Sequence, residues 1–561
     1  MQKAAPGWSF VLASLKVGFI MKRFAQKAYI NGKVYTVDED FRVVSAFCVT
    51  GDRFLATGSD ADIAEYCDNE TEIIDLNGAV VLPGLIDSHL HVTGTGALKL
   101  NLDLAGKTKN QIIALVAEAR TKTAPGGWIT GSGWLQSDWG SSEFPTKAEL
   151  DAVCPDLPAY LSRACGHASW ANSLAFELAG VTADMPDPKG GEIVRTAEGD
   201  LLGVVTDNAQ DRFNKIIPGY DKAQLQQTVL LAQEGFFAAG LTTVHDAGTA
   251  EEYIEAWTPL YESGALKLRI YAMMRPMGRP TYDELFEESM DFFKKGLRIG
   301  LFDNRLTARA YKISGDGSLG ARSAWMLEGY SDRPGFTSDG KWTDEQLYDI
   351  FYAARKSGFQ IMYHAIGDAA NRQALDIYER VIGELPSTDH RLRIEHAQIL
   401  SQSDIPRFPK LGVIPTHQTV FLRSDKEVAD ARLGAERMKG AYAWRTLIDG
   451  GSIVPNGTDS PVEPFNPFLA MHCAVTRTDE QGRPEGGWYI HEAMTREEAL
   501  KSYTIWGAYA GFEEHLKGSI EVGKLADFII IDRDMMVCAA SDIQDTQVLE
   551  TVLGGETVYR R

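Results

Sequence analysis

The chain has 561 residues, of which 44% are hydrophobic and 24% are charged, an ordinary globular composition. Its 77 acidic and 56 basic side chains give a net charge of −21, so nucleic-acid backbones and anionic membrane surfaces repel it and are not expected partners. The six cysteines are scattered without Cys-x-x-Cys spacing, which argues against a cysteine zinc site and a disulfide framework.

Residues 1–26 are interpreted as a leader of doubtful relevance to the fold. The run from Trp8 to Ile20 is moderately apolar, but Lys16 interrupts it and no small-residue cleavage site follows. Met21 is an alternative start. No stretch of the sequence approaches the roughly 18 apolar residues of a membrane span. We therefore expect a cytoplasmic protein, with secretion as the alternative.

The two ends of the chain carry short β-like runs separated by turns. In residues 27–80, Asn31-Gly32 is a strong hairpin signal between two such runs. A matching fragment occupies residues 518–561. These two segments are predicted to combine into one small β-sandwich, with residues 81–517 inserted between them.

The central segment alternates strand-like and helix-like patterns, which predicts βαβ units and a parallel sheet. Eight strands between helices indicate an α/β protein with a (β/α)8 TIM-like barrel, whose chemistry lies at the carboxyl ends of the strands. The predicted strands are 85–91, 241–245, 268–272, 308–313, 360–364, 391–396, 411–415 and 452–456.

The connection between the first two strands is far too long for a simple loop. It runs from about residue 92 to 240, whereas βα loops usually have about 2–6 residues. An insertion subdomain is therefore predicted over about residues 100–210. Within it, 126–134 and 155–165 look like strands and 110–122 looks like a helix.

Six side chains that can bind a metal stand at the carboxyl ends of the predicted strands. His89 and His91 are two residues apart, so on a strand they point to the same face and can serve one ion. Each residue also has an ordinary structural interpretation, such as a capped core histidine or a turn aspartate. The six are His89, His91, Lys312, His364, His396 and Asp459.

Lys312 is the member of this set that is hardest to explain structurally. It lies on a semi-apolar strand, and lysine is rarely buried without a partner. A desolvated lysine loses its proton readily. The neutral amine can then react with carbon dioxide, and the resulting carbamate has two oxygens that can bridge two metal ions.

The order of these six residues resembles that of the amidohydrolase superfamily: His-x-His on strand one, Lys on strand four, His on strands five and six, and Asp on strand eight. The resemblance extends over about residues 27–560 and is narrowed by the neighbouring motifs to amidohydrolase family 3, which contains N-substituted formamide deformylases. The motifs are Tyr311-Lys312-Ile313-Ser314-Gly315-Asp316-Gly317-Ser318-Leu319-Gly320, His364-Ala365-Ile366-Gly367-Asp368, Arg393-Ile394-Glu395-His396-Ala397-Gln398, Gly457-Thr458-Asp459-Ser460-Pro461-Val462 and Lys517-Gly518-Ser519-Ile520-Glu521-Val522-Gly523-Lys524-Leu525-Ala526-Asp527.

The resemblance implies a centre of two divalent metal ions, with zinc expected. It assigns His89, His91 and Asp459 to the more buried ion, His364 and His396 to the other, and carbamylated Lys312 to the bridge. Asp459 would also transfer the proton from water to the leaving nitrogen. A single ion with unmodified Lys312 stays open. The chain departs mildly from the family pattern at Asp207 and Thr458.

The implied function is hydrolysis of a C–N bond, amide or N-formyl, in a small molecule by a metal-activated water. The same site acting on esters or cyclic amides is one alternative, and an inactive metal-binding regulator is another. His167, Asp316 and Trp134 are candidate substrate contacts. The expected partner is a small-molecule amide, and a homodimer is one expected assembly.

Overall fold

The computed structural model describes residues 24–139, 143–163, 168–188, 191–276, 281–387 and 389–561. Residues 1–23, which are most of the predicted leader, and the candidate contact His167 lie outside these ranges. None of the helices in the described part combines the length and apolarity needed to span a bilayer.

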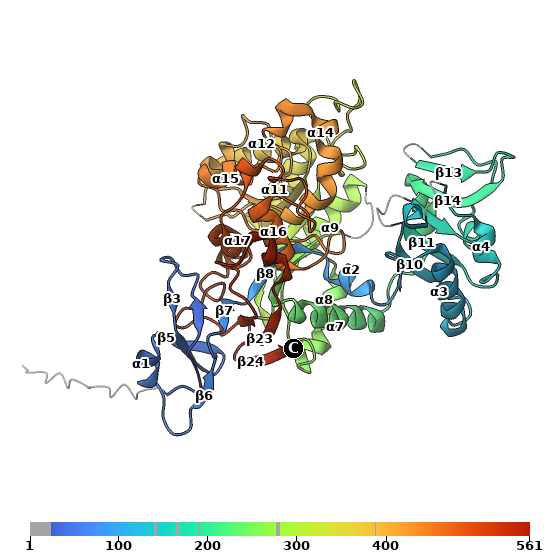
Figure 1. The fold of residues 1–561 in the computed structure, drawn as a ribbon. Coiled ribbons are helices and arrows are strands. Elements are labelled where there is room, and N and C mark those ends of the chain that lie inside the picture. The colour runs from blue at the N-terminus through green and yellow to red at the C-terminus, as the bar shows by residue number, and fades with distance from the viewer. Residues whose placement is uncertain (1–23, 140–142, 164–167, 189–190, 277–280, 388) are drawn as a thin grey trace, which may run out of the picture.

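Seven parallel strands form a nearly closed barrel at the centre of the molecule (Figure 1). Each strand pairs with the next one along the barrel, and helices connect most of them, so seven of the eight predicted strands are present. Strands such as β8 and β16 are buried along their whole length, as expected where helices cover the sheet. The seven are β8 (Leu85–Leu90), β15 (Leu241–Thr249), β16 (Arg269–Met274), β18 (Leu306–Ser314), β19 (Gln360–Ala365), β20 (Arg393–His396) and β21 (Ile414–Thr416).

The eighth predicted strand, 452–456, is not a regular strand. Asn456 makes one isolated parallel bridge to His417. On one side the His417 N–H donates to the Pro455 carbonyl at 3.0 Å, and on the other the Ser88 N–H donates to the Asn456 carbonyl at 2.9 Å. Because proline has no N–H to donate, a continuous ladder cannot form here. The segment closes the ring through separate backbone hydrogen bonds to His417, which follows β21, and to β8.

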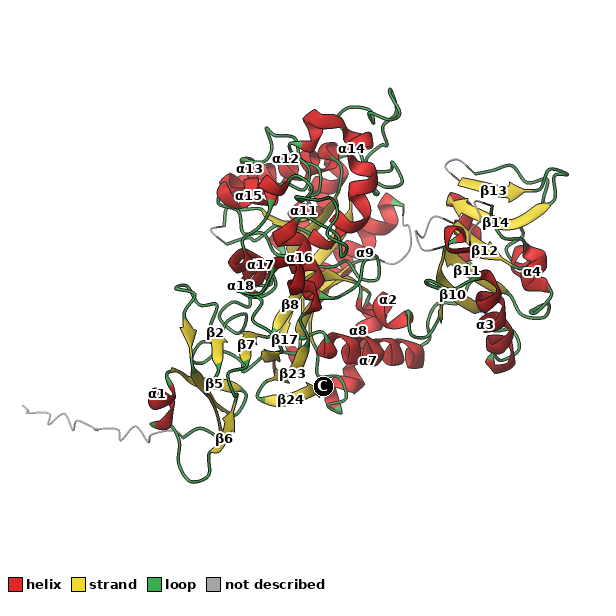
Figure 2. Cartoon of the chain, viewed as in Figure 1, coloured by secondary structure: helices red, strands yellow, loops and turns green. Residues whose placement is uncertain are grey.

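The short strand β17 (Arg298–Gly300) was not predicted and pairs antiparallel with β18. Helices cover the outside of the barrel (Figure 2). Helix α9 shows why: Thr281 and Glu284 form a capping box, and Leu285, Phe292 and Phe293 are buried. The helices of the barrel region are α2 (Val92–Ala97), α7 (Lys222–Ala238), α8 (Glu251–Glu262), α9 (Tyr282–Lys295), α10 (Leu301–Asn304), α11 (Asp344–Lys356), α12 (Asp368–Glu384), α13 (Arg407–Leu411), α14 (Leu422–Met438), α15 (Trp444–Asp449), α16 (Pro467–Thr476), α17 (Arg496–Ser502) and α18 (Ile505–Ala510).

The segment between β8 and β15 forms its own six-stranded sheet, with strand order β13-β14-β12-β11-β10-β9. It stands apart from the barrel, beyond α2 and α7, in Figure 1. A separate hydrophobic cluster, which includes Leu104, Ile112 and Trp170, forms its core. Its elements are β9 (Leu102–Asp103), α3 (Lys109–Lys122), β10 (Ile129–Trp134), α4 (Lys147–Asp151), β11 (Ala159–Arg163), β12 (Ala168–Ala171), α5 (Ser173–Leu178), β13 (Gly191–Arg195), β14 (Leu201–Asp207) and α6 (Asp211–Asn214).

The two chain ends contribute to two further sheets that share one hydrophobic cluster. A four-stranded sheet comes from the N-terminal segment alone, whereas a six-stranded sheet joins strands from both ends of the chain. Phe47 and Phe528, from opposite ends, meet edge to face with ring centroids 4.9 Å apart. The elements are β1 (Lys27–Ile30), β2 (Lys33–Tyr35), β3 (Val43–Val44), β4 (Ala46–Thr50), β5 (Arg53–Gly58), α1 (Asp60–Ala64), β6 (Glu72–Asp75), β7 (Val80–Pro83), β22 (Phe528–Ile531), β23 (Val548–Leu553) and β24 (Glu556–Arg560).

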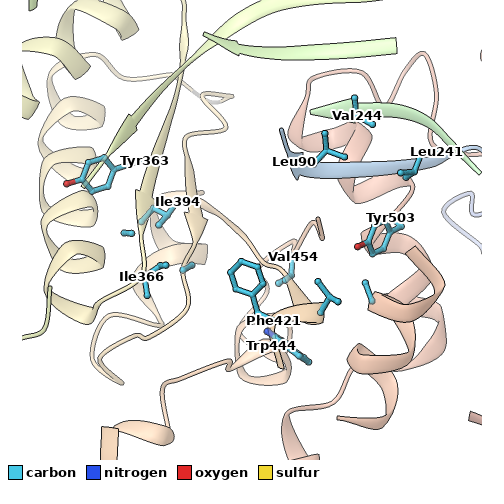
Figure 3. Packing of buried hydrophobic residues seen from close by; sticks show 14 of the residues in the cluster. Leu90, Leu241, Val244, Tyr363, Ile366, Ile394, Phe421, Trp444, Val454 and Tyr503 are labelled. Atoms are coloured by element: carbon cyan, nitrogen blue, oxygen red, sulfur yellow. The ribbon is translucent and has the colours of Figure 1, made fainter. Parts of the chain in front are cut away.

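The largest hydrophobic cluster lies between the barrel and its helices. Figure 3 shows Leu90 of β8 beside Val244 of β15, and Phe421 beside Val454 and Trp444. These residues are far apart in sequence, so the core holds the strand ends in fixed positions around the mouth of the barrel.

Candidate metal centre

His89 and His91 lie at the carboxyl end of β8, and their ring centroids are 6.0 Å apart. His91 is also the residue from which α2 starts. The Nε2 atoms of both rings face Asp459 Oδ1, at 3.5 Å from His89 and 3.2 Å from His91. Burial lowers the pKa of His89 to about 4, so its imidazole is neutral, as metal binding requires.

Asp459 reaches this position from the segment that closes the barrel. Its φ of +55° is left-handed, and its backbone N–H donates to the His89 carbonyl at 2.7 Å. Gly457, two residues before Asp459, passes so close to β8 that a Cβ atom added to it would lie 2.5 Å from the backbone nitrogen of His89. Burial favours the neutral carboxyl, but the imidazoles of His91 and His89 hold the pKa of Asp459 well below its usual range.

His396 lies close to His89 and Asp459, whereas His364 lies beside the His396 ring, outside the group of donors that His396 forms with His89 and Asp459. Donor atoms of His89, His396 and Asp459 all lie within 4.8 Å of one another. The Nδ1 atom of His396 is 2.7 Å from Gln418 Oε1, which leaves Nε2 for another ligand. The ring of His364 is 4.4 Å from that of His396, centroid to centroid, but its Nε2 lies 3.2 Å from the Gly317 carbonyl.

Lys312 lies on β18 and is 5% exposed. Its Nζ is 3.2 Å from His89 Nε2. Burial lowers the pKa of Lys312 to about 8, although Glu395 and Asp459 oppose this shift. A sizeable fraction of this amine is therefore neutral near pH 8.

A buried ionic network holds the side chain of His89, and its contact with His89 was not predicted from the sequence. The carboxylate of Glu395 accepts a short hydrogen bond from His89 Nδ1 and a bidentate pair from Arg393, at 2.7 and 2.9 Å. The Arg393 guanidinium also lies 3.0 Å from His245 Nδ1. Burial alone would raise the pKa of Glu395, but Arg393 and His89 hold it well below its usual range. Glu395 therefore fixes the His89 tautomer, with Nε2 directed at the other ligands.

Asp87, within β8, connects this strand to the segment that carries Asp459. Its Oδ1 accepts hydrogen bonds from the His89 N–H at 3.0 Å and the Thr458 N–H at 3.2 Å. Its Oδ2 accepts one from the Thr458 hydroxyl at 2.7 Å. Asp87 thus ties β8 to the segment that carries Asp459.

Two candidate substrate contacts have other partners in the structure, and a contact of either with a substrate stays a prediction. Trp134 is fully buried in the core of the insertion, and its indole N–H donates to the Leu161 carbonyl at 2.7 Å. Asp316 is 1% exposed and accepts hydrogen bonds from three backbone N–H groups, which belong to Trp325, Ile366 and Gly367. Trp134 is therefore part of the core of the insertion. Asp316 supports the loops beside the candidate ligand His364, whose Nε2 lies 3.4 Å from Asp316 Oδ1.

The donor set fits a divalent metal ion. Asp459 Oδ1 is buried and has no hydrogen-bond partner among the described residues, although two imidazole nitrogens face it. Three neutral or anionic nitrogen and oxygen donors that converge in this way are typical of zinc ligands. An unpaired buried carboxylate oxygen is costly unless a cation satisfies it.

Comparison with known proteins shows the family of the chain. The model of the amidohydrolase family matches residues 72–559. The putative amidohydrolase YtcJ of Bacillus subtilis is 32% identical over 538 residues, with 95% of this chain and 99% of the relative covered. N-substituted formamide deformylase of Arthrobacter pascens is 28% identical over 550 residues, with 95% and 98% covered. The crystal structure of an uncharacterised metal-dependent hydrolase from Pyrococcus furiosus matches with a TM-score of 0.75 at 29% identity and covers 91% of this chain and 99% of that one. The chain belongs to the amidohydrolase family.

Proposed function

We propose that the protein is a metal-dependent amidohydrolase that cleaves an amide or N-formyl C–N bond of a small molecule with a metal-activated water. The observation that carries this proposal is the convergence of donor atoms from His89, His396 and Asp459 beside the amine of Lys312. They meet at the carboxyl end of the barrel strands, where the substrate sites of such barrels lie.

The proposed ligands are those of the sequence analysis, with zinc as the proposed ion. His89, His91 and Asp459 would hold one ion, and His364 and His396 a second. Lys312 as its carbamate would bridge the two: its neutral amine adds to carbon dioxide and releases one proton. When bound, the ions supply Lewis acidity, which lowers the pKa of a water molecule and polarises the scissile carbonyl.

Asp459 is the proposed proton carrier of the reaction. Oδ1 of its carboxylate faces the two imidazoles and would bind the ion, so Oδ2 would accept the proton of the attacking water. As the water oxygen bonds to the carbonyl carbon and the C–N bond breaks, the same carboxyl returns the proton to the leaving nitrogen. The product pair is a carboxylic acid and an amine.

One experiment tests the proposal directly. Purified protein is analysed for metal content, and wild type is compared with Asp459→Asn on formamides, N-acyl amino acids, esters and cyclic amides. We expect one or two ions per chain and a loss of about 10²–10⁴-fold in kcat/KM on an amide substrate for the variant. Absence of metal under zinc-replete conditions, or equal activity of the variant, would refute the mechanism.

A matched control separates the role of Asp459 from a general effect of removing a buried carboxylate. Asp404 is 3% exposed and pairs with Arg372 at 2.9 Å, outside the ligand set. Asp404→Asn is expected to keep metal content and kcat/KM. Intact-mass measurement of wild type and Lys312→Ala reports whether Lys312 carries the mass increment of carbon dioxide, and metal analysis of the same pair separates the two-ion site from a one-ion site.

A further inference from the structure

His91 lies just beyond the sheet that fixes His89. The ladder between β8 and β15 ends one residue before His91. Within the described ranges, no side chain holds Nδ1 of His91 in the way that Glu395 holds Nδ1 of His89. The His91 ring instead packs on Gly248, where an added Cβ atom would lie 3.1 Å from Nδ1. The direction of the His91 side chain therefore depends on how its backbone is held.

The helix that starts after His91 is weak by its own sequence. Gly94 and Gly96 are two of the six residues of α2, and glycine is among the poorest helix formers. His91, at the N-cap, makes no side-chain cap hydrogen bond. Gly96 allows α2 to lie directly on α7 (Figure 1), since a Cβ atom there would lie 1.9 Å from the Thr228 carbonyl oxygen. Contacts from other elements must therefore hold the first turn of α2.

Asp246 of β15 supplies such a contact. Its Oδ1 accepts a hydrogen bond from the Val92 N–H at 2.8 Å, and its Oδ2 accepts one from the Thr249 hydroxyl at 2.5 Å. Val92 is the residue after His91 and is fully buried, so its N–H has no access to water. Asp246 is itself 2% exposed. A carboxylate on the neighbouring strand thus takes the place of the missing N-cap side chain.

We propose that Asp246 is a positioning residue for His91, which holds the first turn of α2 so that the imidazole faces Asp459. This inference rests on the proposed role of His91 as a metal ligand. The His91 N–H donates to the Ser460 carbonyl at 2.8 Å, which fixes the side of the turn next to Asp459. Asp246 fixes the side next to β15. Without its carboxylate, the buried Val92 N–H loses its acceptor, and the turn that carries His91 has to move to find another.

Zinc affinity, measured on the metal-free protein by competition with a chelator, tests the proposal. Asp246→Ala should bind zinc about tenfold more weakly than wild type. Asp246→Asn keeps an acceptor oxygen for the Val92 N–H, and its amide can donate to the Thr249 hydroxyl. It should therefore bind zinc within about threefold of wild type. Wild-type affinity in Asp246→Ala would overturn the proposal.

A double-mutant cycle shows whether Asp246 acts through His91. In a His91→Ala background, Asp246→Ala should cause no further loss of zinc affinity, because the side chain that it positions is gone. A loss of the same size in both backgrounds would overturn the positioning role. Wild-type zinc affinity in His91→Ala alone would instead refute the ligand role of His91, and with it the proposed centre. If Asp246→Ala does not fold, Asp246→Glu replaces it in the cycle, since it keeps the charge and shifts the carboxylate relative to Val92.

Asp151 supplies a matched control within the insertion. Its carboxylate accepts hydrogen bonds from the Ser173 N–H at 2.8 Å and the Ser173 hydroxyl at 2.7 Å, so it supports the first turn of α5. This helix also has six residues. Asp151→Ala should lower the urea midpoint and leave both zinc affinity and the absorption spectrum of the Co²⁺-substituted protein unchanged, whereas Asp246→Ala should alter both. A loss of zinc affinity in Asp151→Ala as large as that in Asp246→Ala would make the effect one of stability and overturn the proposal.

Discussion

Replacing Arg393 by methionine should weaken metal binding, although Arg393 is not among the proposed ligands. Arg393 is fully buried, and its guanidinium is paired with both oxygens of Glu395. It also donates to the Ser88 carbonyl at 2.8 Å. Glu395 in turn holds Nδ1 of His89. Arg393→Met therefore leaves a buried carboxylate whose remaining partner is a ligand.

The size of the effect follows from these contacts. Removing one partner of a buried ion pair costs about 3–5 kcal/mol of stability, because the other charge stays in a low-dielectric interior. Loss of the carboxylate that orients a ligand histidine costs about 10–100-fold in metal affinity. That range equals about 1.4–2.7 kcal/mol. Glu395→Gln keeps an acceptor oxygen near His89, so its loss of metal affinity should fall at the lower end of the range of about 10–100-fold.

A second buried arginine pair supplies the control. Arg269 and Asp527 are 4% and 3% exposed and bonded at 2.7 Å, at the start of β16 and away from the ligands. Arg269→Met should lower the urea midpoint by a similar amount and leave zinc affinity unchanged, as measured by competition with a chelator. If Arg393→Met and Arg269→Met bind zinc with the same affinity, the network through Glu395 does not position His89.

Three other predictions concern single sites. Burial raises the pKa of Asp425 to about 6, above the unfolded value of 3.8, so its contribution to stability is present below about pH 4 and lost as pH rises through 6. Asp425→Asn should therefore raise the urea midpoint more at pH 8 than at pH 5; equal gains would contradict this. Gly457→Ala should lose bound zinc and stability, since its Cβ meets backbone at 2.5 Å, whereas Gly219→Ala has open space and should do neither. Trp134→Ala should cost about 3–5 kcal/mol without changing KM; a raised KM at unchanged stability would make Trp134 a substrate contact.

The barrel is the part of the fold that the sequence predicts well, because each strand is a short buried run followed by a helical pattern. The exceptions have local causes. Pro455 has no N–H group and prevents a regular eighth strand. Its neighbours instead make separate backbone hydrogen bonds to β8 and to His417, which follows β21. The start of β21 shifts because Leu411 ends α13 and Gly412 adopts a left-handed φ of +68°. Neither effect is visible in hydrophobic periodicity alone.

The supporting residues of the site could not be predicted in the same way. Arg393 and Glu395 are two residues apart and therefore share a face of β20, which the sequence does show. It does not show that this face meets His89, which lies more than 300 residues earlier in the chain. The spacing of residues along one strand predicts which side chains share a face, but contacts between strands depend on how the barrel closes.

The proposed ligands depart from regular strand geometry, and this explains how their side chains converge. Asp459, His396 and Ala397 have φ values of +55°, +75° and +41°, which non-glycine residues rarely adopt. Each such residue costs of order 1–3 kcal/mol and persists only where its surroundings hold it. In a regular strand, alternate side chains would stand apart on the two faces of the sheet. The left-handed turn at the strand end instead places the His396 and Asp459 side chains together with His89, within 4.8 Å. The strained residues therefore include two of the donors that the proposed ion would join.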